Sequence, residues 1–262
     1  IDDRTMKRRD AGSYLLLNSR GERMTDLALN AVDLIDRNLY ERSCDVRWWA
    51  TDSAVVQALE EASADAYRHA SERLATILKS YTVYVDLFIT DANGKVVVCG
   101  RPERHPRLMG RDMSGEDWFV NAMRTRNGDE YAVADVRRFP ALDETPVAIY
   151  SAAIRAGGQE NGQALGVLGI AFDWAPQAEG IVKGVRLAEN EKASTRVMLV
   201  DANRRVLASS NDEGILSETF NFRPEGPRGF YCQGDKLIAY ALTPGYETYK
   251  GLGWYGVIET TI

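Results

Sequence analysis

The sequence predicts an α+β fold in which a long N-terminal helix precedes two small modules, each an antiparallel sheet with flanking helices. Two observations lead to this prediction: a helical apolar pattern fills the first 80 residues, and a ten-residue segment then occurs twice. Residues 88–97 read FITDANGKVV, and residues 198–207 read MLVDANRRVL. Their spacing of 110 residues is too long for a solenoid repeat of about 20–50 residues, so it indicates two related modules.

The composition excludes several classes of partner. A net charge of −6 gives no general attraction for nucleic acid or anionic lipid, because both need a surplus of Lys and Arg. No apolar run approaches the roughly 18 residues that cross a bilayer, and the chain starts at Ile1 without a signal-peptide pattern. We therefore expect a soluble segment of a longer polypeptide. Its three cysteines share no metal-type spacing and are expected to be free or buried thiols.

Residues 1–80 are predicted to form an N-terminal helical stalk. Met24, Leu27, Ala31 and Leu34 follow one another at three- and four-residue steps, the period of an amphipathic helix. The pattern breaks at residues 51–53, Thr-Asp-Ser, which are good N-capping residues, and then resumes as a shorter helix. The apolar stripe could pack against a second copy of itself in a homodimer or could cover the adjoining sheets.

The first module is predicted at residues 81–175. The repeated segment forms its opening hairpin at residues 81–100, because an Asp-Ala-Asn turn separates two apolar runs. A loop with two prolines and a short helix at residues 116–124 follow. Strands at residues 131–139, 146–155 and 165–174 complete a five-stranded antiparallel sheet, with the helix inserted between its second and third strands.

A helical connector is predicted at residues 176–195, and the second module at residues 196–262. This module opens with the second hairpin at residues 196–209. Later strands are predicted near residues 229–231, 236–242 and 253–259.

These landmarks together resemble the double Cache (dCache_1) family of bacterial extracytoplasmic sensor domains, in which both modules are PAS-like. The resemblance rests on the paired hairpins, on GRDMS at residues 110–114 with DWF at 117–119, on YAVADV at 131–136 and on GVLGIAFD at 166–173. It implies a periplasmic domain flanked by transmembrane helices that this segment lacks. It also implies a small-molecule ligand in the first, membrane-distal module. Residues 243–254 are similar to the membrane-proximal module of chemoreceptors, which favours that class over histidine kinases and diguanylate cyclases.

The amino-acid-binding branch of this family has Arg-x-Trp-Tyr at the inserted segment, Tyr-x-Asp on the third strand and Asp on the fifth. Here Glu116 stands in place of the Arg, Phe119 in place of the Tyr, and Val133 in place of the strand Tyr. The groups that are lost are those that hold a carboxylate.

The groups that remain, Trp118, Asp135 and Asp173, are those that hold an ammonium group. Carboxylates accept charge-assisted hydrogen bonds from it, and an aromatic face adds a cation–π interaction. We therefore expect an amine or quaternary ammonium ligand rather than a complete α-amino acid.

Ten residues are candidates for the ligand site in the first module. Tyr84 and Asp86 are included because residues two apart on a strand share a face. Asp117 could equally be a favourable charge in the first turn of a helix, and Asp135 could lie on a solvated face. The complete set is Trp118, Asp173, Asp135, Phe119, Glu116, Asp117, Tyr84, Asp86, Tyr150 and Tyr131.

Enzyme motifs are poor, so we expect a sensor without catalytic residues, metal or cofactor. The chain has two histidines, too few for the common zinc sites, and it lacks a phosphate-binding loop and a nucleophile elbow. Two alternatives stay open. The ligand could be an amino acid or an organic anion, held in the latter case by the arginines of residues 101–111, or the double module could bind a partner protein.

Overall fold

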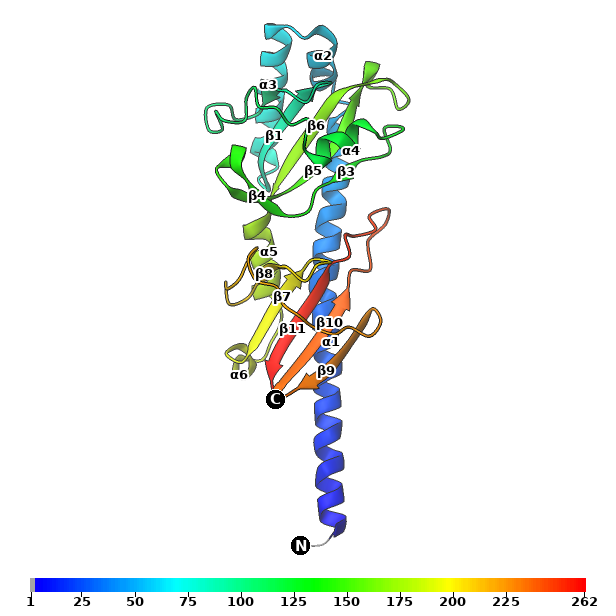
Figure 1. Ribbon diagram of the computed structural model, residues 1–262, viewed down its shortest axis with the longest axis vertical. Helices are drawn as coiled ribbons and strands as arrows, with labels where there is room; N and C mark the ends of the chain where they lie inside the picture. The colour runs from blue at the N-terminus through cyan, green and yellow to red at the C-terminus, as the bar shows by residue number, and fades with distance from the viewer. Residues whose placement is uncertain (1–2) are drawn as a thin grey trace. The chain divides into compact units, whose positions relative to one another are not determined.

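The computed structural model describes residues 3–262, which form two compact units. One unit, here called the N/C unit, combines the described residues up to Leu39 with Ala178–Ile262. The other, the central unit, is Tyr40–Gln177. Both units have an antiparallel sheet and helices, so the predicted α+β class is confirmed (Figure 1). The predicted module boundaries stay predictions.

Helix α1, Asp3–Trp49, contributes to both units. In the N/C unit its buried face includes Met24, Ala31 and Ile35, which follow the helical period. Leu34 is 46% exposed, so the predicted stripe was wrong at this position. A Cβ on Gly256 would lie 2.2 Å from the main-chain oxygen of Ala28, so only glycine lets α1 come this close to the sheet.

Two shorter helices follow α1 in the central unit. Helix α2, Ser53–Glu61, begins after Asp52, whose carboxylate accepts from the backbone N–H of Ala54 at 3.0 Å. The predicted break at residues 51–53 is therefore confirmed. A second break was not predicted: α2 ends at Ala62 in the left-handed region (φ 52°), and Ser63 caps α3, Ala64–Ser80.

The sheet of the central unit has six antiparallel strands in the order β2-β1-β6-β5-β3, with β4 also paired to β5. Where one strand was predicted at residues 131–139, the structure has two short ones, β3 and β4. Helix α4, Asp117–Met123, is inserted between β2 and β3, and the short 3₁₀ helices η1, Pro140–Leu142, and η2, Ala156–Gly158, follow. The strands are β1 Tyr84–Asp91, β2 Val96–Cys99, β3 Ala132–Val133, β4 Arg137–Phe139, β5 Thr145–Arg155 and β6 Ala164–Asp173.

The sheet of the N/C unit has five antiparallel strands in the order β8-β7-β11-β10-β9. The predicted connector contains two helices, α5, Trp174–Lys183, and α6, Glu189–Lys192. The strands are β7 Thr195–Val200, β8 Val206–Ser209, β9 Arg228–Gln233, β10 Lys236–Leu242 and β11 Tyr255–Thr261.

Both copies of the repeated segment form the predicted hairpin, and they share its turn geometry. In each turn the first Asp accepts two backbone hydrogen bonds through Oδ1: Asp91 from Asn93 and Lys95, and Asp201 from the matching residues of the second copy. The fourth turn residue has positive φ in both, 88° at Gly94 and 70° at Arg204. The likeness is therefore one of backbone conformation as well as sequence.

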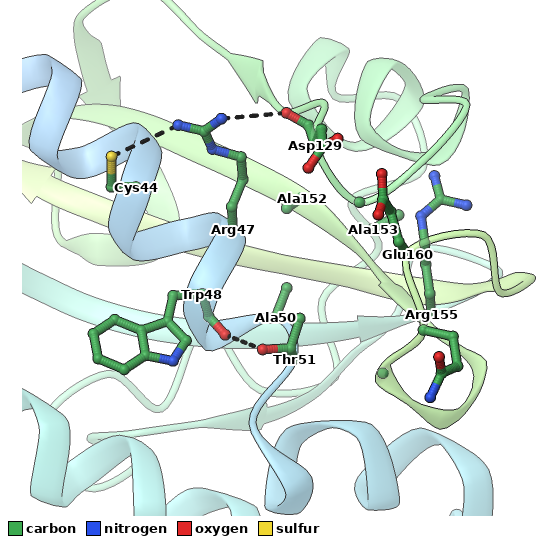
Figure 2. Close-up of a pocket in the computed structure, with 13 residues that line it drawn as sticks. Cys44, Arg47, Trp48, Ala50, Thr51, Asp129, Ala152, Ala153, Arg155 and Glu160 are labelled. Atoms are coloured by element: carbon green, nitrogen blue, oxygen red, sulfur yellow. Dashed lines mark hydrogen bonds between the residues drawn. The ribbon is translucent and has the colours of Figure 1, made fainter. Parts of the chain in front are cut away.

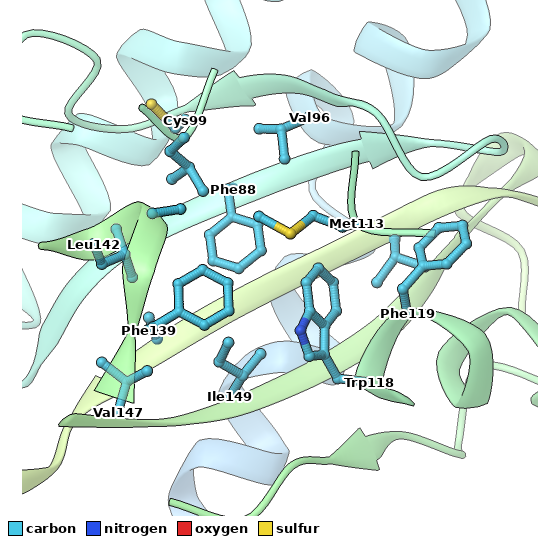
Figure 3. Packing of buried hydrophobic residues seen from close by; sticks show 14 of the residues in the cluster. Phe88, Val96, Cys99, Met113, Trp118, Phe119, Phe139, Leu142, Val147 and Ile149 are labelled. Atoms are coloured by element: carbon cyan, nitrogen blue, oxygen red, sulfur yellow. The ribbon is translucent and has the colours of Figure 1, made fainter. Parts of the chain in front are cut away.

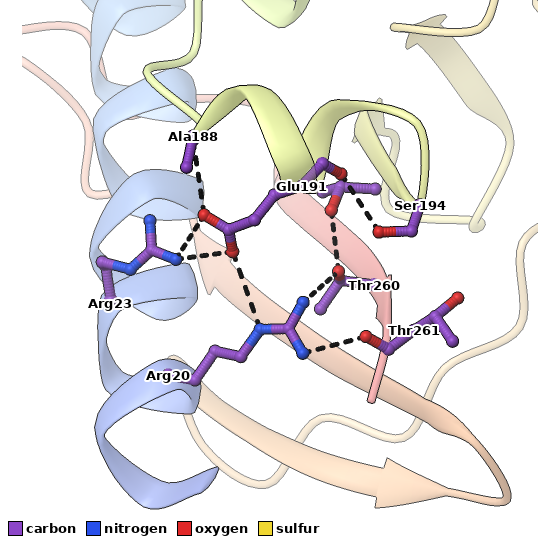
Figure 4. Close-up of polar contacts among 8 residues, drawn as sticks. Arg20, Arg23, Ala188, Glu191, Ser194, Thr260 and Thr261 are labelled. Carbon is purple, nitrogen blue, oxygen red and sulfur yellow. Dashed lines mark hydrogen bonds and ion pairs between the residues drawn. The ribbon is translucent and has the colours of Figure 1, made fainter. Parts of the chain in front are cut away.

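A polar network in the N/C unit holds α1 against α6 and β11 (Figure 4). Glu191 of α6 accepts from Nη2 of Arg23 with both oxygens, each at 2.6 Å. Arg20 donates to the main-chain oxygen of Thr261 and to Oγ1 of Thr260, both at 2.9 Å. The hydrogen bonds from Arg23 are the main reason that the pKa of Glu191 is lowered.

Within residues 3–262, none of the helices has the length and apolar character needed to cross a membrane. The three cysteines are free: Cys99 is buried, Cys44 is half-buried and Cys232 is exposed. This agrees with the expected free or buried thiols.

Candidate functional site

The inserted helix α4 and the loops beside it cover one face of the central sheet, here called the α4 face. A continuous apolar cluster fills the space between them (Figure 3). Phe88 of β1, Ile149 of β5 and Ala171 of β6 face it from the sheet, and Trp118 and Phe119 face it from α4. The predicted ligand face is therefore largely occupied by side chains of the protein.

Trp118 lies at the centre of this cluster and is 1% exposed. Its ring makes edge contacts with Phe88 and Phe119, with centroids 5.4 and 6.4 Å apart. Its main-chain oxygen accepts from Oγ of Ser151 at 2.9 Å, which ties α4 to β5. The indole Nε1 is buried and has no hydrogen-bond partner among the described residues, which is a costly state for a polar atom.

Asp173 ends β6 on the same face, because it pairs with Val147, a member of the cluster. The carboxylate is half-buried, and burial is the cause that raises its pKa. Among residues 3–262 it has no hydrogen-bond or ion-pair partner. An acid in this state favours a cation, because the cation would offset the cost of burying the charge.

Glu116 and Asp117 begin α4. The carboxylate of Glu116 accepts from Nη2 of Arg137 at 2.5 Å, so the residue that replaces the family's Arg is part of an ion pair. Asp117 is exposed in the first turn of the helix. Asp135 is also exposed, in the loop after β3, and its carboxylate accepts from the backbone N–H of Val136 at 2.9 Å.

Tyr84 and Asp86 lie on opposite faces of the sheet, so the expectation that they share a face was wrong. Tyr84 pairs with Phe172 and Asp86 with Ala171, which makes Val85 the extra residue of a β-bulge. The hydroxyl of Tyr84 donates to Oδ2 of Asp45 on α1.

The carboxylate of Asp86 is used within the protein. It accepts from the backbone N–H groups of Leu87 and Gly100, and its Oδ2 lies 2.7 Å from Nδ1 of His105. Asp86 and His105 are both buried, so Asp86 anchors the loop after β2 to β1.

Tyr131 and Tyr150 stack on each other, with ring centroids 6.3 Å apart, on the side of the sheet that faces α1. Two arginines of α1 lie over aromatic rings on this side. The guanidinium of Arg47 is 5.2 Å from the ring centroid of Tyr131, and that of Arg42 is 5.2 Å from the ring centroid of Tyr84. Tyr84 and Tyr131 therefore contact α1, and Tyr150 lies with Tyr131 on this side of the sheet and not on the predicted ligand face.

The predicted residues are thus divided between the two faces of the sheet. The structure brings together Glu116, Trp118, Phe119 and Asp173 on the α4 face. It places Tyr84, Tyr131 and Tyr150 on the other face.

The arginines proposed for an anionic ligand do not converge on a common point in the described contacts. Arg104, Arg107 and Arg111 are exposed. Arg101 donates to the main-chain oxygen of Val85 at 2.8 Å.

A cavity of about 430 Å³ in the central unit was not predicted from the sequence (Figure 2). The end of α1, the end of β5 and two loops line it, and none of the ten predicted residues is among its lining residues. Its walls come from three separate parts of the chain without a common motif, which is why sequence patterns could not reveal it. The sequence does show one feature of this cavity, because each of the two loops carries an acidic residue: Asp129 in one and Glu160 in the other.

The sequence matches the dCache_1 family model, described as a Cache domain, over residues 13–261. No curated protein matches it. Solved structures share the fold at low identity. The sensor domain of the histidine kinase DctB of V. cholerae has a TM-score of 0.67 and 12% identity, covering 95% of this chain and 99% of that chain.

Two chemoreceptor domains are similar to the same degree. The sensory domain of Tlp3 (CcmL) of Campylobacter jejuni has a TM-score of 0.68 and 16% identity, with 95% of this chain and 96% of that chain covered. The ligand-binding domain of the amino acid chemoreceptor PctC of Pseudomonas aeruginosa, in complex with GABA, has a TM-score of 0.67 and 16% identity, covering 92% of this chain and 99% of that chain.

Proposed function

The chain belongs to the Cache domain family, and from this premise we propose that it is the periplasmic sensor domain of a bacterial transmembrane chemoreceptor. We further propose that it binds a small amine or quaternary ammonium compound in the central unit, next to Asp173.

The environment of Asp173 is the observation that supports an amine as the ligand. It is a half-buried acid with a raised pKa and without a partner among the described residues. An ammonium group beside it would form charge-assisted hydrogen bonds worth about 1.5–3 kcal/mol each. The apolar cluster beside Asp173 would contact the hydrocarbon part of the ligand.

The pairing of Glu116 with Arg137 also favours an amine. Where the amino-acid-binding branch has an Arg for the ligand carboxylate, this chain has an acid that is already neutralised. Because Trp118 and its neighbours fill the interior, we expect the ligand to bind at the margin of the cluster, where Asp173 is partly exposed.

Binding would act by population shift. A ligand that contacts both α4 and β6 would favour the conformation in which these two elements lie closest. The resulting change in the population of that conformation would be the signal. A homodimer through α1 is part of the same proposal. The exposed side chains of Tyr14, Leu15 and Leu16 offer apolar surface for it.

Isothermal titration calorimetry with a panel of amines, quaternary ammonium compounds, amino acids and organic acids tests the proposal. We expect an amine to bind, and Asp173→Asn to weaken it more than tenfold. Asp65→Asn, which removes the same charge from an exposed helix position, should leave the affinity unchanged. Equal affinities for wild type and Asp173→Asn would contradict the assignment, and a blank across the whole panel would favour the partner-binding alternative.

A further inference from the structure

Three residues form a row across the end of the central sheet where Asp173 lies. Arg137 of β4 pairs with Val147 of β5, and Val147 pairs with Asp173 of β6. Residues that pair directly across antiparallel strands have their side chains on the same face of the sheet. Val147 belongs to the apolar cluster (Figure 3), so the side chains of Arg137 and Asp173 both lie on the α4 face.

The side chain of Arg137 is long enough to reach Asp173. Neighbouring strands are about 4.8 Å apart, so the Cα atoms of these two residues, two strands apart, are separated by about 10 Å. Five bonds of about 1.5 Å join Cα to Cζ of an arginine, so its guanidinium extends about 6 Å from Cα. The carboxylate of Asp173 extends across most of the remaining distance. An ion pair between the two residues is therefore geometrically possible.

Instead, another acid holds Arg137. Its Nη2 donates to the carboxylate of Glu116, the residue before α4, at 2.5 Å, and its guanidinium lies 5.1 Å from the ring centroid of Phe139. Asp173 has no ion-pair partner among the described residues, and burial is the cause that raises its pKa. Arg137 thus pairs with Glu116 and leaves the charge of the acid in its own row uncompensated.

A second arginine at this end of the sheet is also restrained. Arg101 donates to the main-chain oxygen of Val85 at 2.8 Å, in the bulge of β1 beside the end of β6. A main-chain oxygen therefore restrains Arg101, whereas the restraint on Arg137 depends on one side chain, that of Glu116. A single substitution can release Arg137, which makes this restraint testable.

We propose that Glu116 is a positioning residue of the amine site: it holds Arg137 away from Asp173 and so keeps that carboxylate available to a ligand. Without the carboxylate of Glu116, the guanidinium of Arg137 would pair with Asp173, because a cation offsets the cost of burying a charge. It would then occupy the place of the ligand's ammonium group. The effect on ligand binding rests on the amine site proposed above, whereas the choice of partner by Arg137 can be tested without a ligand.

An NMR titration of the carboxyl carbon of Asp173 in the ligand-free protein tests which acid Arg137 pairs with. The signal is assigned by its loss in Asp173→Asn. In Glu116→Gln the raised pKa of Asp173 should fall to the ordinary value of an Asp or below it, because the guanidinium now lies beside the carboxylate. In the double variant Glu116→Gln/Arg137→Gln this pKa should stay raised as in the wild type.

Glu130→Gln is the matched control for the NMR titration. It breaks an exposed ion pair with Arg126 in the same unit, and the pKa of Asp173 should not change. Circular dichroism and the melting temperature establish that each variant is folded. An unchanged pKa of Asp173 in Glu116→Gln, or a fall that persists in the double variant, would overturn the inference.

Calorimetric titration with n-butylamine measures the effect on binding. Glu116→Gln should weaken binding at least tenfold, whereas Arg137→Gln and the double variant should both stay within about threefold of the wild type. If Glu116 acted only through its charge, Arg137→Gln would tighten binding by about the factor that Glu116→Gln loses. If the ion pair only supported the fold, both single variants would weaken binding and the double variant would not restore it. Either pattern would overturn the inference.

The two experiments separate this inference from the proposal of an amine ligand. If n-butylamine and the rest of the amine panel do not bind to the wild type, the proposed ligand class fails. The NMR titration then decides alone whether Glu116 keeps Arg137 away from Asp173. If the amine binds and Asp173→Asn weakens it, but Glu116→Gln binds as the wild type does, the amine site stands and the role of Glu116 is overturned.

Discussion

The phenolic oxygen of Tyr84 lies 2.5 Å from Oδ2 of Asp45, and this hydrogen bond ties β1 to α1 within the central unit. Burial raises the pKa of both groups. The ionised form of Asp45 is therefore stabilised mainly by the hydrogen bonds that its carboxylate accepts. Another donor, Nη2 of Arg42, lies at 3.4 Å. The geometry indicates a structural role for Tyr84 rather than contact with a ligand.

Tyr84→Phe is therefore expected to lower the free energy of unfolding by about 1–3 kcal/mol, because it leaves the half-buried carboxylate of Asp45 without its closest donor. Urea denaturation measures this loss. Tyr81→Phe is a suitable control, since Tyr81 is 38% exposed and should change the stability by less than about 0.5 kcal/mol. An unchanged stability combined with weaker amine binding would instead show that Tyr84 contacts the ligand.

Glu191 should make the stability of the N/C unit depend on pH. Its pKa is lowered in the folded state by the hydrogen bonds from Arg23, so the folded protein binds this proton less readily than the unfolded chain. The stability that ionised Glu191 contributes is complete above the ordinary pKa of a Glu. It is lost as the pH falls through the lowered pKa that Glu191 has in the folded protein. At about pH 7 Glu191→Gln should cost about 1.5–3 kcal/mol. The difference between the two proteins should shrink as the pH falls below the ordinary pKa of a Glu.

Urea denaturation across this pH range measures the effect. Glu189→Gln is the matched control, because Glu189 is 88% exposed and its ion pair with Lys192 should contribute little. A difference between wild type and Glu191→Gln that persisted undiminished at low pH would contradict the assigned role.

Gly94→Ala should lower the free energy of unfolding by about 1–3 kcal/mol. The residue has φ of 88°, and an added Cβ would lie 2.7 Å from the backbone nitrogen of Ser114. Gly115→Ala is the control, because no atom lies within 4 Å of the position that its Cβ would take and its φ is not positive. Thermal or urea unfolding compares the two, and equal effects would mean that the turn tolerates a side chain in the first copy as it does at Arg204.

Two substitutions at Trp118 separate its size from its polar atom. Trp118→Ala should cost about 3–5 kcal/mol, because it opens a large cavity in a closed apolar cluster. Trp118→Phe should cost clearly less, because it leaves a smaller cavity and Nε1 has no hydrogen bond to lose among the described residues. Similar losses in the two variants, measured by urea denaturation, would show that the indole N–H has a partner such as a water molecule.

The three cysteines should differ in reactivity. Burial raises the pKa of Cys99 to about 12, whereas Cys232 is exposed. With Ellman's reagent at about pH 8, Cys232 should react at least about a hundredfold faster than Cys99, which should react only when the unit opens. Cys232→Ser should remove the fastest phase, and a fast phase that remained in the double variant Cys44→Ser/Cys232→Ser would contradict the burial of Cys99.

Local sequence signals predicted the elements that depend on a few neighbouring residues. The hairpins could be predicted because Asp91 and Asp201 each satisfy two backbone N–H groups of their own turn. The start of α2 could be predicted because Asp52 caps it. The break before α3 was missed because Ala62, which adopts positive φ there, has no preference for that conformation.

The predicted site depended on which side of the sheet each residue faces, and that could not be obtained from the sequence alone. Simple alternation placed Tyr84 with Asp86, but the bulge at Val85 separates them. Trp118 lies between α4 and the sheet, and only the packing shows that it is inside a closed cluster. Asp129 and Glu160 line the same cavity because a backbone hydrogen bond joins Gly128 to Glu160 across two loops that are distant in the sequence, which no local pattern indicates.

The bulge at Val85 also has a consequence for how this protein can change over time. Removing this one residue would make Tyr84 the direct neighbour of Asp86, so plain alternation would keep the ring of Tyr84 on the α1 side and Asp86 on the opposite side. Removing a residue from the regular part of β1, such as Phe88, would instead turn every side chain before it to the other face of the sheet. Among functional variants, loss of Val85 should therefore be found more readily than loss of any other single residue of β1.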